Sequence, residues 1–385
     1  MPWQQARRLA YQAVAPVAIR TVPLEAAIGA ALAMDAQACT DLPATDTSAM
    51  DGWAVSGPSP WRVVGEVLAG ASPVALAAGT AVSIATGAVI PAGADGVLRR
   101  EWGTMDGAVA RPNADAPDGA GSRGVPTGQD VRPAGKECRA GDVVLPAGVR
   151  LGPVAIGLLA AAGFDDLPVR RAEVDLFVLG DELLDHGPAR DGRVRDALGP
   201  LLAGWLPASG VEIASRRRVP DRADELAAAL RASRADVVVT TGSTARGPVD
   251  HLHEVLAVLG AHLIVDGVAV RPGHPQLLAI LPDGRPLIGL PGNPLAAVSG
   301  LLTLLAPVVA RLLGRPFPQD AVMTLAVNID AGTDATRLLP VQAGRPVRFT
   351  GPAMLRGLTV ADGIAVIPAG GADRGVEVQL LNLPR

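Results

Sequence analysis

Strands and helices alternate between residues 171 and 314, and this alternation limits the possible folds more than any other feature of the sequence. Strand patterns occur at residues 174–179, 211–218, 235–241, 277–281 and 287–290. Helical patterns occur at residues 194–206, 220–230, 249–259 and 295–313. Such alternation is typical of an α/β layer domain with a mostly parallel sheet, which we expect from about 171 to 314.

The centre of this region, residues 235–250, has the pattern of an anion site. A β-branched run leads into a loop of small and hydroxyl residues, and a helical pattern begins at Val249. Backbone N–H groups and the helix dipole converge at such a junction, so a phosphate can bind there. Asp250 is expected in the first turn of the helix, where a metal ion can bridge it to that phosphate.

Two other segments are expected beside this loop. Residues 180–182 (GDE) and residues 291–293 (PGN) each follow a predicted strand, as Thr241 and Gly242 do. Ligands of open α/β sheets bind at the carboxyl ends of the strands. Asn293 is the expected N-cap of the apolar helix that follows, with Pro294 at its first position.

Outside this region the patterns are different. Further helical patterns occur at residues 3–14, 23–33 and 151–162, and an all-β pattern extends from residue 61 to about 145. Short strands return at residues 323–327, 347–349, 363–367 and 376–380, which predicts a small β-barrel or sandwich. Residues 111–130, rich in Gly, Pro, Asp and Asn, are expected to form a mobile loop or an insertion.

Composition limits the function classes. A chain of 385 residues with 49% hydrophobic residues is expected to form two to four domains. A net charge of −4 gives no general attraction to nucleic acid or to acidic membranes. Two cysteines and no apolar leader indicate a reducing compartment, and we expect a cytoplasmic location. The apolar window at 295–313 is interrupted by polar residues, which favours a buried helix over a membrane span.

Six segments carry a family resemblance. They are residues 48–55 (SAMDGWAV), 91–97 (PAGADGV), 180–183 (GDEL), 240–250 (TTGSTARGPVD), 271–275 (RPGHP) and 290–294 (LPGNP). In this order they resemble the motifs of the molybdopterin molybdenumtransferase family, which includes MoeA and the E domain of gephyrin. The resemblance covers essentially the whole chain.

The resemblance implies an α/β plus β fold. A MogA-like three-layer α/β domain that binds molybdopterin would comprise residues 171–315. An elongated α+β linking and dimerisation domain would combine residues 1–40 with 142–170, and an inserted β domain at 41–141 would carry the SAMDG motif. A small C-terminal β-barrel would comprise residues 316–385. Family members act as homodimers, in which the inserted β domain covers the partner subunit's cleft.

The implied activity is the insertion of molybdate into adenylylated molybdopterin, with Mg²⁺ and with release of AMP. A MogA-like adenylyltransferase is a candidate partner. Two alternatives remain open. The chain is either an active enzyme or a divergent homologue that binds molybdopterin, or acts as a scaffold, without inserting metal. A CinA-like nucleotide pyrophosphatase shares only the α/β module, and the SAMDG region and the C-terminal strands argue against it.

Site residues follow from the motifs. The expected catalytic residues are Asp51, Asp181, Glu182 and Asp250. The expected Mg²⁺ ligands are Asp196, Asp221 and Asp250, because Mg²⁺ takes one or two carboxylates together with phosphate oxygens. The expected cofactor-binding residues are Thr241, Gly242, Ser243, Gly247, Arg271, His274, Pro291, Gly292, Asn293 and Pro294.

Simpler structural roles compete with several of these assignments. Asp221 follows a proline and is expected to cap a helix, and Asp250 also favours a helix N-terminus for electrostatic reasons alone. Asp51 precedes a glycine, as turn residues often do. His274 is either a ligand or a surface loop residue. His251 and His253 point to different faces of a helix, so we assign them packing or solvent roles and not metal binding.

Substitutions within the motifs favour the alternative without metal insertion. Arg271 and His274 replace two family lysines, and only arginine keeps a permanent charge with a forked donor geometry. Ser243 replaces a glycine of the anion loop, where a side chain crowds the phosphate or requires a different backbone turn. The remaining substituted positions are Ala245 in the anion loop, and Lys136, Leu179, Ala197 and Leu198, which lie outside the six segments at further positions of the family pattern.

Overall fold

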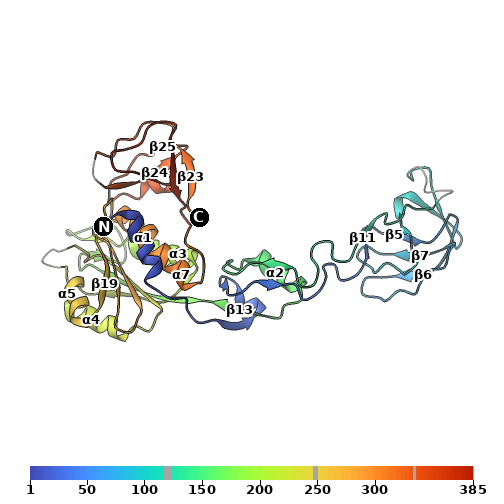
Figure 1. Ribbon diagram of the computed structural model, residues 1–385, viewed down its shortest axis with the longest axis horizontal. Helices are drawn as coiled ribbons and strands as arrows, with labels where there is room; N and C mark the ends of the chain where they lie inside the picture. Colours follow the sequence, from blue (N-terminus) through green and yellow to red (C-terminus); the bar gives the residue numbers. More distant parts are fainter. Residues whose placement is uncertain (117–123, 246–249, 333–334, 385) are drawn as a thin grey trace.

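The computed structural model describes residues 1–116, 124–245, 250–332 and 335–384. The molecule is elongated, with an α/β unit and a C-terminal sheet at one end, a narrow neck, and a β unit at the other end (Figure 1). The chain passes through the neck twice, because the β unit at the far end is inserted between two halves of the neck. We call this inserted part, which contains β4 to β11, the distal unit.

A six-stranded sheet forms the centre of the α/β unit. Its strands, in spatial order, are β17 (Val211–Val219), β14 (Ala172–Leu179), β18 (Val237–Thr241), β22 (Pro286–Leu290), β21 (Leu277–Ile280) and β19 (His262–Asp266). The first four strands are parallel, and β21 and β19 each run antiparallel to their neighbour. The predicted, mostly parallel sheet is therefore confirmed.

Helices cover both faces of this sheet. On one face lie α1 (Trp3–Gln12), α3 (Leu198–Ser209), α6 (Pro294–Gly300), the π-helical segment η3 (Leu301–Leu305) and α7 (Ala306–Leu312). On the other face lie α4 (Ala223–Ala232) and α5 (Leu252–Leu259). Alternate residues of β14 enter the two layers, because side chains of a strand alternate between its faces. Leu176 and Val178 pack into the first layer, whereas Phe177 and Leu179 pack into the second.

The long apolar helix lies in the core. Pro294–Leu312 is long and apolar enough to cross a membrane, yet 89% of its most apolar window is buried inside the protein, as the sequence predicted. Its π-helical segment places Thr303 opposite α1, where the Thr303 hydroxyl accepts a hydrogen bond of 3.0 Å from the indole N–H of Trp3. This buried contact joins the first helix of the chain to a helix some 300 residues later.

The neck consists of short elements. Its strands are β1 (Arg20–Pro23), β2 (Ala31–Leu32), β13 (Asp166–Arg170), β3 (Ala36–Gln37) and β12 (Val143–Leu145), and α2 (Pro153–Ala161) packs beside them. The prediction of α2 is confirmed, but the helix expected at 23–33 is wrong. Only the 3₁₀ turn η1 (Leu24–Ala27) forms there. Gly29 has a φ of +82°, and β2 pairs with β13, so tertiary pairing overrides the local helical pattern.

The distal unit is all-β, as predicted. Its main sheet has the order β8 (Gly96–Arg99), β5 (Gly52–Val55), β7 (Thr80–Ile84), β6 (Trp61–Val67), β10 (Val109–Pro112) and β9 (Gly103–Asp106). The 3₁₀ turn η2 (Arg100–Trp102) follows β8, and β4 (Thr47–Ser48) pairs with β11 (Val131–Arg132). The start of the loop predicted at 111–130 belongs to β10, and residues 117–123 lie outside the described residues.

The C-terminal sheet takes one strand from the α/β unit. Its order is β20 (Val270–Arg271), β24 (Thr336–Gln342), β26 (Gly363–Ile367), β27 (Glu377–Leu381) and β23 (Ala321–Thr324), with β25 (Arg345–Pro346) beside β24 and the 3₁₀ turn η4 (Arg356–Thr359) after it. The strand expected at 347–349 is wrong, and β24 was missed because Pro340 interrupts its pattern. Among the described strands no pairing joins β20 to β23, so closure into a barrel stays a prediction.

Three helix starts in the α/β unit differ from the predictions. Residues 194–195 are not helical but form β16 (Val194–Arg195), which pairs in parallel with β15 (Leu183–Leu184), and α3 begins only at Leu198. Helix α4 begins at Ala223 with Arg222 at its N-cap, so the N-cap role expected for Asp221 is wrong. Helix α5 begins at Leu252, so Asp250 precedes the helix instead of lying in its first turn.

Candidate functional site

A cavity of about 700 Å³ opens at the carboxyl ends of β14, β18 and β22. Eleven of the residues selected from the sequence line it: Glu182, Asp196, Asp221, Thr241, Gly242, Ser243, Asp250, Pro291, Gly292, Asn293 and Pro294. They come from four loops that are far apart in the sequence. The expectation that ligands bind at these strand ends therefore correctly located the cavity.

Five selected residues are not among those that line the cavity. Asp181 lies between Gly180 and Glu182, which both line the cavity. Arg271 is the last residue of β20, and His274 lies in the loop that follows it. Asp51 belongs to the distal unit, and Gly247 lies outside the described residues. The cavity also contains Leu183, Thr244 and Pro275, which lie in the motifs but were not selected, and Val194, Arg195 and Ala353, which lie outside the six motif segments.

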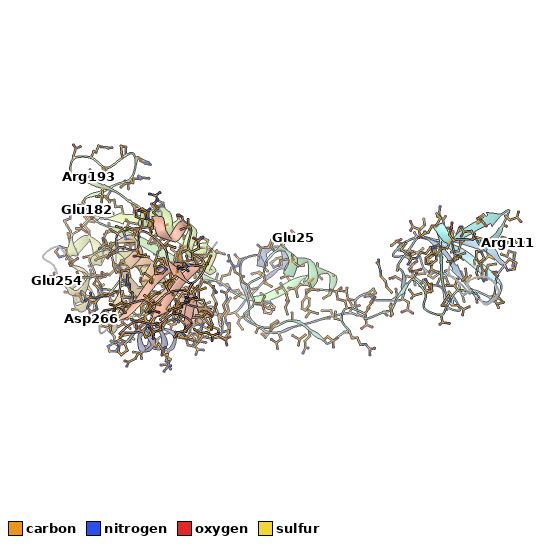
Figure 2. All side chains as sticks on the ribbon, turned by 90° about the horizontal axis from the view of Figure 1, so that it is seen from above. Glu25, Arg111, Glu182, Arg193, Glu254 and Asp266 are labelled. Carbon is orange, nitrogen blue, oxygen red and sulfur yellow. The ribbon has the colours of Figure 1, made fainter. Side chains whose placement is uncertain are left out.

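The loop after β14 holds two acidic residues in different ways. Gly180 has a φ of +127°, and a Cβ there would lie only 2.9 Å from the Oε2 atom of Glu182, so the Glu182 carboxylate folds back over this glycine. The backbone N–H of Asp181 donates to the Oδ2 atom of Asp221 at 3.0 Å. Asp221 therefore fixes this loop and does not cap a helix. Figure 2 shows Glu182 at the end of the molecule opposite to Arg111 of the distal unit.

The loop after β18 adopts a tight left-handed turn. Gly242 has a φ of +82°, and its N–H donates to Leu290 at 2.8 Å, which extends the pairing between β18 and β22. Ser243 also has a left-handed backbone, with a φ of +56°. Its hydroxyl accepts a hydrogen bond of 2.8 Å from the N–H of His251, the N-cap residue of α5. Gly242 and Ser243 therefore form a defined turn in which the Ser243 hydroxyl caps the next helix.

The loop after β22 leads into helix α6, whose N-terminus is capped by a residue from another part of the chain. Asn293 occupies the N-cap position of α6 and Pro294 the first helical position, as predicted, but the Asn293 side chain makes no capping hydrogen bond. The carbonyl of Pro352 instead accepts hydrogen bonds from the N–H groups of Leu295, at 2.8 Å, and Ala296, at 3.3 Å. Because Ala353 lines the cavity, the segment around Pro352 and Ala353 forms part of the cavity wall.

Asp196 is buried, and both of its carboxylate oxygens accept hydrogen bonds. Its Oδ1 atom accepts a hydrogen bond of 2.8 Å from the N–H of Gly199, and its Oδ2 atom accepts one of 3.2 Å from Arg216. These contacts give Asp196 a structural role, and its expected role as a Mg²⁺ ligand stays a prediction. Within the described residues no group of three or more His, Cys, Asp or Glu is arranged to hold a metal ion.

The carboxylates of Asp221 and Asp250 still fit a magnesium ion that is bound together with phosphate. Asp221 and Asp250 both line the cavity, and Mg²⁺ usually takes one or two carboxylates while phosphate oxygens and water complete its shell. The ion would therefore depend on the substrate for most of its ligands. A closed cage of protein ligands is not required.

The two expected phosphate-binding cations lie outside the cavity lining. The Nδ1 atom of His274 donates a hydrogen bond of 2.7 Å to the carbonyl of Val268, which lies six residues earlier, so this side chain is directed to its own backbone segment. Arg195 is instead the basic residue among the described residues that line the cavity. Sequence reasoning did not select Arg195, because a helix was predicted from residue 194, whereas Val194–Arg195 form β16.

Asp51 occupies a turn of the distal unit, at the start of β5. Its Oδ1 atom accepts hydrogen bonds from the backbone N–H of Thr86, at 2.7 Å, and from the Thr86 hydroxyl, at 2.9 Å. These donors, the backbone N–H above all, hold the pKa of Asp51 below its usual value. The distal unit lies at the opposite end of the molecule from the cavity (Figure 1), so one chain does not bring Asp51 to the other candidate residues.

Comparison with known proteins covers both ends of the molecule. Residues 1–163 match the model of the MoeA N-terminal region (domain I and II), and residues 175–311 match a probable molybdopterin binding domain. A molybdopterin molybdenumtransferase of Synechococcus elongatus is 36% identical over 320 residues, which are 78% of this chain and 77% of that protein. One of Staphylococcus aureus (strain COL) is 30% identical over 344 residues, covering 84% and 79%.

The fold comparison extends over the whole chain. The crystal structure of a molybdopterin biosynthesis MoeA protein from Pyrococcus horikoshii superposes with a TM-score of 0.76 at 26% sequence identity. The superposition covers 99% of this chain and 98% of that one. The similarity therefore includes the distal unit and the C-terminal sheet as well as the α/β unit.

Proposed function

The chain belongs to the molybdopterin molybdenumtransferase family, the family of MoeA, and from that premise we propose that it inserts molybdate into adenylylated molybdopterin and releases AMP. Membership makes it a transferase of molybdenum cofactor biosynthesis. The observation that carries the finer proposal is the cavity, in which an anion loop and carboxylates from separate loops converge.

The proposed division of roles follows from the positions of these residues. The turn at Thr241, Gly242 and Ser243 presents backbone groups to the phosphoanhydride of the substrate. Asp221 and Asp250 would hold Mg²⁺, which when bound neutralises charge on the phosphate oxygens. Glu182, which lines the cavity and whose carboxylate folds over Gly180, is proposed as a further catalytic acid beside the anhydride. Pro291 and Gly292 shape the wall where the pterin would bind.

The substitution at Ser243 no longer favours a non-enzymatic homologue. Ser243 keeps the left-handed turn that the family's glycine would provide, and its hydroxyl contributes a helix cap. The loop therefore accommodates the side chain. The alternative of a molybdopterin-binding homologue now depends on the remaining substitutions, at Lys136, Leu179, Ala197, Leu198, Ala245 and His274.

We further propose a homodimer in which Asp51 of one subunit acts in the cavity of the other. The distal unit is too far from its own cavity to contribute (Figure 1). Helix α2 in the neck presents an unusually apolar outer surface, with Val154 87% exposed and no atom within 4 Å of a Cβ built at Gly157. An exposed apolar face of this kind is typical of a protein interface. A second copy packed on α2 fits this surface.

The supply of substrate and the location of the protein also remain proposals. A MogA-like adenylyltransferase is the proposed source of adenylylated molybdopterin, because the substrate must carry AMP before it enters the cavity. We propose a cytoplasmic location, in line with a reducing compartment. Cys39 and Cys138 are both free thiols, which is consistent with this location.

An assay of the purified protein tests the proposal. Adenylylated molybdopterin, molybdate and Mg²⁺ are supplied, and AMP release is measured together with the formation of active cofactor. We expect turnover by the natural protein. Tight pterin binding without AMP release would leave only the non-enzymatic homologue, and loss of all binding would exclude both functions. AMP release without any need for molybdopterin would favour a nucleotide pyrophosphatase.

Asp250→Ala tests the assigned acid in the same assay. We expect turnover to fall by about a hundredfold or more, while the melting temperature stays close to that of the natural protein. Asp224→Ala is the matched control, because Asp224 is an exposed aspartate on α4 that does not line the cavity. Full activity of Asp250→Ala, or its failure to fold, would contradict the assignment.

A further inference from the structure

We infer that Arg195 is the cation that binds the phosphate groups of the substrate and of the AMP product, in place of the two lysines that this chain lacks. The inference rests on the proposed function, since it assigns a residue to the phosphoanhydride bound in the same cavity. Neither the family motifs nor the two expected cations point to this position. Arg195 is therefore assigned from its place in the fold.

The described residues that line the cavity carry more negative than positive charge, which disfavours an anionic ligand. Four carboxylates line it, from Glu182, Asp196, Asp221 and Asp250, and Arg195 supplies the guanidinium among the described lining residues. Asp196 is paired with Arg216, but the other acids repel a phosphate. Cations beside a phosphoanhydride would offset this repulsion. Mg²⁺ would offset the charge of the carboxylates that hold it. A guanidinium fits the geometry of a phosphate, because it can donate two parallel hydrogen bonds to the phosphate oxygens.

The backbone of Arg195 is held on both sides. Strand β16 pairs with β15, and the N–H of Val194 donates to the carbonyl of Glu182 at 3.0 Å. The next residue, Asp196, donates its N–H to Leu184 at 3.0 Å and is anchored through its side chain to Gly199 and Arg216. The backbone of Arg195 is therefore fixed to the same loop that carries Glu182.

The guanidinium is oriented yet retains donors for a ligand. Its Nη1 atom donates to the carbonyl of Leu184 at 3.2 Å, which is the hydrogen bond that the described residues provide for this side chain. A guanidinium has five N–H donors in a planar fork. Most of them therefore remain for phosphate oxygens, and less rotamer freedom is lost when a phosphate binds.

Arg195→Ala tests the inference with two probes, AMP and adenosine, each titrated by calorimetry in the presence of Mg²⁺. We expect the Kd for AMP to rise about tenfold or more, which corresponds to about 1.4 kcal/mol. Adenosine lacks the phosphate, so its Kd should stay within about twofold of that of the natural protein. Arg195→Lys keeps the charge and loses the fork, so it should recover part of the affinity for AMP.

Two further variants complete the design. Arg190→Ala removes the same charge from an exposed position of the same loop that does not line the cavity, and it should leave both affinities unchanged. Arg271→Ala tests the rival cation. An unchanged AMP affinity in Arg195→Ala, or equal weakening of AMP and adenosine, would overturn the inference. If the natural protein binds neither probe, the proposed function itself fails, which is a separate result.

Discussion

Ser243 combines an unfavourable backbone with a favourable side-chain contact. Its φ of +56° disfavours any residue with a Cβ by about 1 kcal/mol, and its hydroxyl caps α5 through His251. Ser243→Ala loses the cap and keeps the strain, so we expect it to lower the free energy of unfolding by about 1 kcal/mol. Ser243→Gly loses the cap and the strain together, so its free energy of unfolding should stay near that of the natural protein.

Urea denaturation of the two variants and the natural protein measures this difference. The glycine variant should be more stable than the alanine variant by about 1 kcal/mol. Equal stability of the two variants would show that the left-handed backbone at residue 243 is not strained in solution.

Asp51 allows a prediction about pH. Hydrogen bonds from the Thr86 N–H and hydroxyl depress the pKa of its carboxyl in the folded state. A depressed pKa adds stability that is present above the unfolded value of about 3.9 and is lost as pH falls through the folded value. Thr86→Val removes the hydroxyl donor, so the pKa of Asp51 should rise toward its usual value while remaining below it. NMR titration of the side-chain carboxyl measures this shift, and an unchanged pKa would contradict the role of the hydroxyl.

At the scale of elements, the segment around Pro352 connects the C-terminal sheet to the cavity. Its position depends on Gly357, where an added Cβ would lie 2.6 Å from the carbonyl oxygen of Arg348 and 2.8 Å from that of Phe349. Backbone oxygens cannot yield without moving the segment. Gly357→Ala should therefore shift the Pro352 carbonyl away from α6, lower the free energy of unfolding by about 1–3 kcal/mol and weaken AMP binding.

Gly351→Ala is the matched control for this prediction. A Cβ at Gly351 would meet only the flexible end of Met354, at 3.2 Å, so the neighbouring side chain can rotate away. We expect stability and AMP affinity close to those of the natural protein. If both glycine variants behave alike in denaturation and calorimetry, the segment does not support α6 in the way its hydrogen bonds indicate.

The elements that were predicted incorrectly share a cause. Residues 23–33 and 194–206 have apolar spacing that suits a helix, yet Ala31–Leu32 and Val194–Arg195 form short strands because a partner strand lies beside each of them. Strand β24 was missed because it contains a proline. Long periodic segments such as α6 to α7 and the buried strands of the central sheet were predicted well, because their pattern extends over many residues.

At the scale of the whole molecule, the separation of Asp51 from the cavity leads to a test of the homodimer. Asp51→Asn and Asp250→Asn should each be nearly inactive alone. Subunit exchange between them produces hybrid dimers in which one of the two cavities has both aspartates intact, so mixing should restore about a quarter of the natural activity. AMP release measured before and after exchange checks this expectation.

The formation of hybrids is checked separately, with differently tagged subunits. Hybrid dimers without any recovered activity would contradict the proposal that Asp51 acts in the partner's cavity. A protein that remains monomeric in sedimentation at all concentrations would contradict the dimer itself. Val154→Glu on the exposed face of α2 should weaken the association, because it places a charge on an apolar interface.

The sequence by itself determined the main alternation of strands and helices in the α/β region, though not β15, β16, β19 and β20, together with the buried apolar helix and the loops that meet at the strand ends. These follow from local periodicity and from the rule that parallel strands present their carboxyl ends at one edge. Only the tertiary structure decided that Arg195 enters the cavity, that Asp196 is held by Arg216, and that Pro352 caps α6. It also separated Asp51 from the other acids. Each of these depends on contacts between segments distant in the chain, which local patterns do not encode.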